Sequence, residues 1–331
     1  MIAIILYLSY GIICLVLLLV GLLMFLTYRF QRGKKRVIQY LEGLNIKRME
    51  GLGTTGSLEI LPLIDWYTDK PGLQGETGVS YLIKTDETTI LFDVGYNYEQ
   101  TDPSPLLHNM SALGVSLDDF DRIFVSHNHL DHVGGLKFMR RKSFSLTLRQ
   151  LPLKGKIVYT PIPMNYPGLK PIHTEAPTPI AKGVCSIGAI PTQLFFLGWT
   201  LEQALACRVE GKGIVLIIGC GHQTLPRILE RAEALFEDPL YGVLGGLHFP
   251  VTKGRQLVLG IPLEKFVGTG KPPWRPINKR DVLKNIELLK TKNPKLVALS
   301  AHDSCDWTLS AFREAFQGAY QDLRVGKKII I

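Results

Sequence analysis

The sequence has little cysteine and lacks a P-loop. Its five cysteines are irregularly spaced, and one of them, Cys14, lies in the apolar N-terminal stretch, so they do not form a disulfide framework. No P-loop is present, and no internal repeat stands out. The glycines of Gly51-Leu52-Gly53-Thr54-Thr55-Gly56 are interpreted as a flexible joint and not as a dinucleotide-binding fingerprint. These features argue against a disulfide-stapled secreted module and against the nucleotide-binding enzymes that use a P-loop or that fingerprint.

Charge is missing from the first part of the chain. Residues 2–28 contain no charged side chain and are rich in leucine, isoleucine and valine. A helix of that length spans about 40 Å, which exceeds the ~30 Å hydrocarbon core of a bilayer. A cleaved signal peptide begins with basic residues, but no lysine or arginine precedes this run. We therefore predict that residues 1–28 are a retained transmembrane anchor, with the lipid bilayer as partner of residues 2–28.

Basic residues follow the apolar run at once. Between Arg29 and Glu50 there are seven basic residues and two acidic ones. The positive-inside rule then predicts a single-pass membrane protein whose large domain is cytoplasmic. Residues 29–57 are expected to form a basic juxtamembrane linker, which either lies on anionic headgroups or is a solvated connector. The rest of the chain is only mildly basic, so no nucleic-acid partner is expected.

From residue 58 to residue 331 the pattern is that of one globular domain. Short β-type runs alternate with helical patterns in two strand-rich halves. The expected strands include 58–63, 79–84, 89–92, 122–126, 204–210, 213–218, 241–244 and 295–300, and the expected helices 104–114, 224–236, 279–290 and 307–317. Two such halves predict an α/β fold, an αββα sandwich with two sheets face to face and helices outside.

Metal-capable side chains are concentrated directly after one of these strands. His127, His129, Asp131 and His132 lie within six residues, after the apolar run 123–125. Imidazole and carboxylate groups are preferred ligands of zinc-like ions. Three more histidines, His222, His248 and His302, also follow predicted strands or lie at strand-to-helix turns. Six histidines in the same structural context indicate a shared metal site.

The order of these motifs resembles the metallo-β-lactamase fold superfamily. The signature is His127-x-His129-x-Asp131-His132, and Leu91-Phe92-Asp93-Val94-Gly95, Gly219-Cys220-Gly221-His222 and Ala301-His302 resemble its other motifs. Gly245-Gly246-Leu247-His248 and Glu76-Thr77-Gly78-Val79-Ser80 resemble the branch that includes the dihydropterin aminobenzene-phosphate synthase-like proteins. The resemblance runs from about Leu58 to the C-terminus and implies a metallo-β-lactamase-like catalytic domain.

The resemblance also implies a ligand set. His127, His129 and His222 would bind a first metal, and Asp131, His132 and His302 a second, with one or two Zn²⁺ ions expected and Mn or Fe as alternatives. Most members of the superfamily bridge the two metals with an aspartate located between the third and last motifs. Here His248 stands in that position, as a ligand, as a group behind the ligands or as a substrate contact.

Two further positions near the expected ligands have alternative interpretations. Asp93 is expected to accept the second N–H of a ligand histidine, which would fix its tautomer; the alternative is an ordinary turn aspartate. Cys220 and Cys305 lie beside expected ligands and are interpreted as small packing residues.

The expected chemistry is hydrolysis. Bound zinc lowers the pKa of water from about 15.7 to about 7, which gives a nucleophile for a carbonyl carbon or a phosphorus. Asp131 and His248 are the catalytic candidates. The basic insert 250–277, with Trp274, is expected to border the cleft, so we expect a small anionic substrate such as a phosphoester. The alternatives are carbon–nitrogen bond chemistry on a pterin-like phosphate and a non-catalytic metal-binding membrane module.

Overall fold

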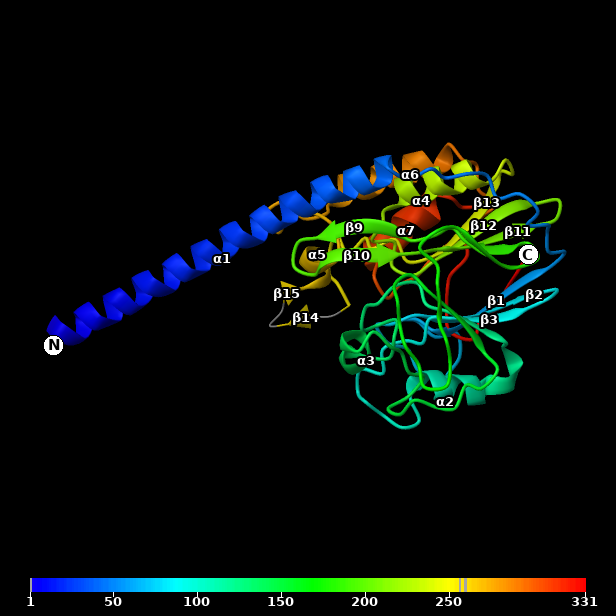
Figure 1. Cartoon of the computed structure of the whole chain (residues 1–331), viewed down its shortest axis with the longest axis horizontal. Coiled ribbons are helices and arrows are strands. Elements are labelled where there is room, and N and C mark those ends of the chain that lie inside the picture. The colour runs from blue at the N-terminus through cyan, green and yellow to red at the C-terminus, as the bar shows by residue number, and fades with distance from the viewer. Residues whose placement is uncertain (1, 256, 259–260) are drawn as a thin grey trace.

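The computed structural model describes residues 2–255, 257–258 and 261–331. A long N-terminal helix, α1 (Ile2–Glu42), projects from a folded body (Figure 1). This body consists of two β-sheets with helices outside them. The N-terminus lies far out at the free end of α1, whereas the C-terminus lies at the opposite end of the folded body. The expected α/β fold is confirmed.

The first sheet contains the strands of the N-terminal half and the last strand of the chain. Its order is β17-β1-β2-β3-β4-β5-β6, antiparallel from β17 to β3 and parallel from β3 to β6. Helices α2 (Pro105–Ala112) and α3 (Leu136–Arg140) and a short 3-10 turn (Leu117–Asp119) belong to this half. The strands are β1 (Leu58–Ile64), β2 (Ser80–Thr85), β3 (Thr89–Phe92), β4 (Arg122–Phe124), β5 (Ile157–Thr160), β6 (Ile172–His173) and β17 (Ile329–Ile330).

The second sheet has the order β16-β13-β12-β11-β8-β7, and β12, β13 and β16 are parallel. Helices α4 (Leu225–Leu235), α6 (Lys279–Lys290) and α7 (Asp306–Ala315) accompany it. Its strands are β7 (Thr178–Ala181), β8 (Val184–Ser186), β11 (Leu205–Val209), β12 (Gly213–Ile218), β13 (Leu240–Gly245) and β16 (Leu296–Leu299). Apart from the sheets stand the hairpin of β9 (Ile190–Leu194) and β10 (Gly198–Glu202), and the insert elements β14 (Leu257–Val258), β15 (Ile261–Pro262) and α5 (Glu264–Val267).

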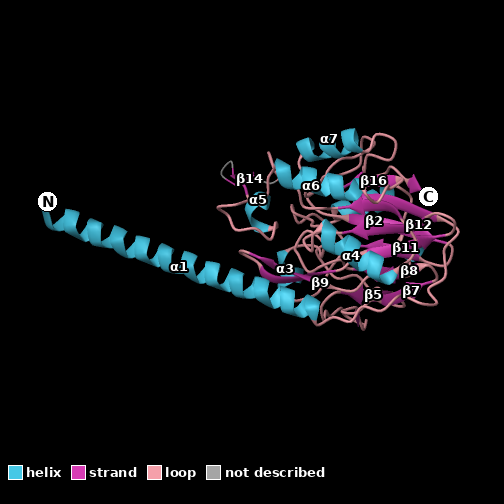
Figure 2. Cartoon of the chain, turned by 90° about the horizontal axis from the view of Figure 1, so that it is seen from above, coloured by secondary structure: helices cyan, strands magenta, loops and turns pink. Residues whose placement is uncertain are grey.

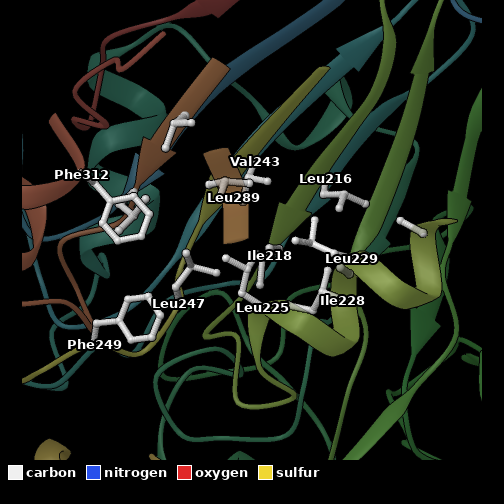
Figure 3. Packing of buried hydrophobic residues seen from close by; sticks show 14 of the residues in the cluster. Leu216, Ile218, Leu225, Ile228, Leu229, Val243, Leu247, Phe249, Leu289 and Phe312 are labelled. Carbon is white, nitrogen blue, oxygen red and sulfur yellow. The ribbon is translucent and has the colours of Figure 1, made fainter. Parts of the chain in front are cut away.

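Three buried clusters hold these layers together. Successive side chains of a strand point to opposite faces, so Tyr81 and Ile83 of β2 enter the core between the sheets while Leu82 faces the helices of the first half. In β12, Val215 and Ile217 face the other sheet, and alternate residues such as Leu216 face α4 and α6 (Figure 3). A strand buried on both faces reads as a continuous apolar run, as β12 does. The layers are helix, sheet, sheet, helix.

Helix α1 continues beyond the expected anchor. It does not break at residue 28 but runs to Glu42, through the first half of the expected linker. This second half of the helix lies against β9 and β10 (Figure 2), where Phe30 and Val37 are buried. The two side chains are seven residues apart, which is two helical turns, so they share one face of the helix. The basic segment therefore forms a docked helix rather than a free connector.

Candidate metal centre

The predicted ligand residues meet at one edge of the sandwich. His127 to His132 follow β4, His222 follows β12, His248 follows β13 and His302 follows β16. The ring centroids of His127 and His132 are 4.2 Å apart, those of His129 and His222 are 4.8 Å apart, and those of His132 and His302 are 5.4 Å apart. Parallel strands end at the same edge of a sheet, and this brings residues from the two halves of the chain into one cluster.

Hydrogen bonds orient two of these histidines through serine. Ser126 Oγ donates its one proton to Asp93 Oδ2 at 2.6 Å. In its 2.9 Å contact with His127 it must therefore be the acceptor, so Nδ1 of His127 carries the proton. Nε2 of His127 is then left as a free lone pair, and this buried atom has no hydrogen-bond partner within the described residues. An unpaired buried nitrogen is costly unless a cation takes it.

His302 is held by the same kind of relay. Ser300 Oγ lies 2.5 Å from Asp65 Oδ2 and 2.5 Å from Nδ1 of His302. If the hydroxyl donates to the carboxylate, Nδ1 of His302 carries the proton and Nε2 presents its lone pair. Asp65 is buried and also accepts the backbone N–H groups of Ala301 and Trp66.

His132 and His222 have the same orientation without a serine. Nδ1 of His132 lies 2.6 Å from Asp93 Oδ2, and Nδ1 of His222 lies 2.8 Å from the carbonyl oxygen of Gly268. Each acceptor fixes a proton on Nδ1 and turns Nε2 toward the cluster. Nε2 of His222 lies 3.1 Å from Nδ1 of His129. His127, His222 and His302 thus direct Nε2 toward the cluster as a ligand atom, and His132 directs Nε2 the same way but carries a proton on it in the absence of metal. Imidazole nitrogens of this kind suit a zinc-like ion.

Cys220 lies in the middle of the cluster. Its Sγ is 3.0 Å from Nε2 of His132 and 3.2 Å from Nε2 of His302. It also shares a group of candidate ligands with Asp131, and another with His127 and His222, in which the ligand atoms all lie within 4.8 Å of one another. Burial raises the pKa of Cys220 well above its usual value, so it is a thiol without metal, but a bound zinc ion would displace the proton. Cys220 is therefore a candidate ligand as well as a buried packing residue.

The sequence signal for Cys220 as a ligand was its position in Gly219-Cys220, directly after an apolar strand. Cys305, in contrast, contacts Thr308 at the start of α7.

Glu202 was not predicted from the sequence, although it shapes the loop that carries two of these groups. Its carboxylate, fully buried at the end of β10, accepts the backbone N–H groups of Cys220, Gly221 and His222 at 2.9, 2.8 and 2.8 Å. Burial raises the pKa of Glu202 to about 7. A single acidic residue between Gly198 and Cys207 was the only local signal of this role.

His248 lies beside the cluster with an unusual backbone. Its φ is +52°, a region that non-glycine residues rarely adopt. Asp303 Oδ2 accepts its backbone N–H at 2.9 Å, and its Nε2 lies 3.1 Å from the carbonyl oxygen of Glu264. Nδ1 is buried and has no hydrogen-bond partner among the described residues. Cys220, His248 and Asp303 form a third group of candidate ligands.

Burial keeps most of the imidazoles neutral. It lowers the pKa of His127, His222 and His302 well below the usual value, with further lowering from neighbouring imidazoles, and lowers that of His129 to about 4. Burial would raise the pKa of Asp131, but the opposite charge of His132 reverses this and lowers it. Burial would likewise lower the pKa of His132, but Cys220 and Asp131 raise it well above its usual value, so a metal ion would take the place of the second proton on Nε2. Neutral imidazole and ionised carboxylate are the forms that bind metal.

A pocket of roughly 280 Å³ opens onto the cluster. Its histidine floor is surrounded by apolar walls, made by Leu130, Met139, Leu197, Leu263 and Val267. The insert borders the pocket as expected, although Gln256, Leu259 and Gly260 lie outside the described residues. Among the described lining residues there is no lysine or arginine.

Arg255 and Lys271 of the insert are paired with groups outside this pocket. Arg255 bonds to the carbonyl oxygens of Ala301 and Ser304 and to Asp306, and Lys271 pairs with Asp281. This pocket therefore does not support the expectation that basic residues of the insert face the substrate, whereas Lys271 lines a neighbouring pocket together with His222 and His248.

Comparisons with known proteins agree with this geometry. The family model of the metallo-beta-lactamase superfamily matches residues 73–144. A 7,8-dihydropterin-6-methyl-4-(beta-D-ribofuranosyl)-aminobenzene-5'-phosphate synthase of Methanocaldococcus jannaschii is 22% identical over 261 residues, which cover 66% of this chain and 87% of that protein.

Two solved structures share the fold. Tm1679, a metal-dependent hydrolase of the beta-lactamase superfamily, has a TM-score of 0.55 at 21% identity and covers 82% of this chain and 98% of its own. The metallo-beta-lactamase fold protein YhfI of Bacillus subtilis has a TM-score of 0.50 at 14% identity, over 83% and 100% of the two chains.

Proposed function

This chain is a metallo-beta-lactamase-fold protein, and we propose that it is a membrane-anchored, metal-dependent hydrolase of an ester-type small molecule. One observation carries the proposal. His127, His132, His222 and His302 each have Nδ1 engaged by an acceptor, so that Nε2 is directed into the cluster around Cys220. That arrangement suits a cation and has no evident purpose in a packed core.

The ligands divide into two neighbouring groups. Asp131, His132 and His302 would hold one ion and His127 and His222 the other, with Cys220 in both groups. His129 is proposed as the third ligand beside His222, whose Nε2 lies 3.1 Å from its Nδ1, although it is in neither group of candidate ligands. Zn²⁺ is the proposed metal, with Mn or Fe as alternatives. A bound ion of this kind supplies a Lewis acid and a water of lowered pKa.

Two residues of the chain are proposed to handle protons. Asp131 lines the pocket, and its low pKa makes it a carboxylate at neutral pH that can orient a water or accept its proton. His248 also lines the pocket, and burial lowers its pKa, so it is neutral at pH 7. If its Nε2–H donates to the carbonyl of Glu264, Nδ1 remains as the proton acceptor.

The anchor is α1. Of the described helices, it alone is long and apolar enough to cross a bilayer. Every side chain from Tyr7 to Phe25 is exposed, as a lipid-facing segment would be. The basic residues from Arg29 to Arg36 support a cytoplasmic catalytic domain. Because the pocket walls lack basic side chains, the charge of an anionic substrate such as a phosphoester would be met by the metal ions themselves.

A second candidate function rests on one comparison. The similar protein from Methanocaldococcus jannaschii is named a synthase. Carbon–nitrogen bond chemistry on a pterin-like phosphate would use the same metal cluster. A non-catalytic metal-binding module at the membrane is the third possibility, and metal content and turnover separate all three.

The test uses the full chain in detergent, loaded with Zn, Mn or Fe. It is assayed on a panel of phosphoesters, thioesters and lactones. We expect turnover in the wild type, a fall of at least ~100-fold in His129→Ala, and little change in His173→Ala, whose side chain is exposed on β6. A metal-loaded chain that is inert on every ester would contradict the hydrolase, and a chain that binds no metal would contradict both enzymes.

A further inference from the structure

The β9–β10 hairpin has an apolar tip. Phe196 and Leu197 form the turn between the two strands and are 43% and 48% exposed. Two exposed side chains of the insert, Leu263 and Trp274, are 41% and 52% exposed. The ring of Trp274 lies 5.4 Å from that of Phe195, so insert and hairpin are in contact. Exposed apolar side chains gathered in this way mark an interaction surface.

This tip lies level with the end of the apolar part of α1. Arg29, the first charged residue after the uncharged run, donates from Nη2 to the carbonyl oxygens of Phe195 and Phe196 at 3.1 and 2.8 Å. The neighbouring Phe30 is buried, with its ring 5.4 Å from that of Phe195. The tip of the hairpin is therefore at the height at which a membrane-spanning helix would enter the headgroup layer.

More contacts along the helix fix its direction. The guanidinium of Arg36 lies 4.6 Å from the ring of Trp199, and Tyr40 Oη donates to Glu175 at 2.9 Å. From Arg29 to Tyr40 the helix rises about 16 Å, and contacts spread over this length fix the direction of its axis relative to the folded body. Its free part leaves the folded body from the end that carries the hairpin, α5, β14 and β15, opposite the C-terminus (Figure 1).

The pocket connects with this surface. Leu197 and Leu263 are both exposed and also line the pocket above the histidine cluster. Leu130, Met139 and Val267 continue the apolar wall, beside the polar Thr77 and Glu264, so a largely apolar path leads from the surface beside α1 to the metal ligands. Exposed basic residues of α1, Arg32, Lys34 and Lys35, flank the same region and suit anionic headgroups.

Resting on the proposed anchor and hydrolase, we propose that the pocket mouth lies on the bilayer and that the substrate is an amphiphilic ester drawn from it. Its apolar chain passes between Leu197 and Leu263 while its ester group reaches the histidine cluster. Water supplies the hydroxyl that bonds to the carbonyl carbon or phosphorus. The ester bond to the leaving oxygen breaks, that oxygen receives the proton from water, and the products are an acid and an alcohol.

The position of the mouth is tested without turnover. The full chain is reconstituted in vesicles of zwitterionic and anionic phospholipid, in a Cys14→Ser background because Cys14 is the exposed cysteine. An environment-sensitive fluorophore is attached to Phe196→Cys or to Ile330→Cys, which is 73% exposed next to the C-terminus. We expect lipid-borne quenchers to quench the probe at position 196 several-fold more strongly than the probe at 330. Equal quenching would overturn the proposal.

The substrate class is tested by activity. The double variant Phe196→Ser/Trp274→Ser changes two exposed residues that do not line the pocket, with Ile330→Ser as its control. Each is assayed on a long-chain ester in vesicles and on a water-soluble short-chain ester of the same headgroup. We expect the double variant to lose at least ~10-fold on the vesicle ester only, because exposed apolar side chains carry the surface contact.

Three results would count against the proposed amphiphilic substrate. Equal loss on both esters, or no preference of the wild type for the vesicle ester, would overturn this inference and leave the hydrolase intact. A metal-loaded wild type that is inert on both esters but active on another member of the phosphoester, thioester and lactone panel would overturn the amphiphilic substrate and leave the hydrolase intact. Inertness on the whole panel would refute both, while the quenching result separately decides where the mouth lies.

Discussion

Replacement of Glu202 by glutamine tests how the cysteine-bearing loop is held. The carboxylate accepts three backbone N–H groups with two oxygens. Glutamine has nearly the same shape but only one acceptor oxygen, so at least one buried N–H of the loop loses its partner. An unpaired buried donor costs ~1–3 kcal/mol. In the metal-free variant the loop can leave its ligating position to hydrate that N–H, so zinc binding has to restore the loop against this cost. Since 1.4 kcal/mol is about tenfold in an equilibrium constant, zinc affinity should fall by roughly 5- to 100-fold.

The assay is a zinc titration in competition with a chromogenic chelator. It is run at pH 8, above the pKa of Glu202 of about 7, so that the carboxylate is ionised. Glu210→Gln is the matched control, because Glu210 is exposed in the turn after β11. Circular dichroism and thermal unfolding show whether each variant is folded. A folded Glu202→Gln protein with zinc affinity within twofold of the wild type would refute the reasoning.

Three other predictions follow from the same structure. Asp93→Asn should lower zinc affinity by about 10- to 100-fold in the same titration, because it weakens the acceptor of His132; unchanged affinity would make Asp93 an ordinary turn residue. Burial raises the pKa of Asp65 to about 6, so between pH 4 and 6 the folded metal-free protein binds more protons than the unfolded chain and its stability falls as pH rises. In urea titrations the free energy of unfolding of the wild type should fall by on the order of 2 kcal/mol between pH 4 and 6, and Asp65→Asn should remove this fall. An equally steep pH dependence in the variant would exclude Asp65 as its source. Deletion of residues 1–28 should give a folded protein soluble without detergent on gel filtration, since buried Phe30 and Val37 remain, and insolubility would count against the anchor.

The fold and the histidine cluster could be predicted because their signals are local. Alternation along short apolar runs indicates strands, and the spacing of His127 to His132 after such a run places several ligand types at one strand end. The histidines after β12, β13 and β16 could be assigned to the same site because parallel strands end at a common edge.

Long-range contacts explain what the sequence did not show. Asp65 meets Ser300 across 235 residues, and no local pattern links them. Glu202 acts through the backbone of a loop 18 to 20 residues later, and Cys220 becomes central only when the two sheets bring His132 and His302 together.

The direction in which a side chain points also could not be predicted from the sequence. The charge of the insert is visible in the sequence, but Arg255 turns toward backbone carbonyls and leaves apolar residues at the pocket. Likewise, the basic composition after residue 28 suggested a linker, whereas Phe30 and Val37 form a buried stripe against a hairpin far along the chain.

The metal content of the purified full chain tests the central claim most directly. Elemental analysis of the wild type, after purification without chelators and after incubation with Zn, Mn or Fe, should find one to two ions per chain. The double variant His127→Ala/His302→Ala should lose them, and His173→Ala should keep them, because His173 lies on the exposed strand β6. A folded wild-type chain that carries no metal and takes up none of the three would contradict the account.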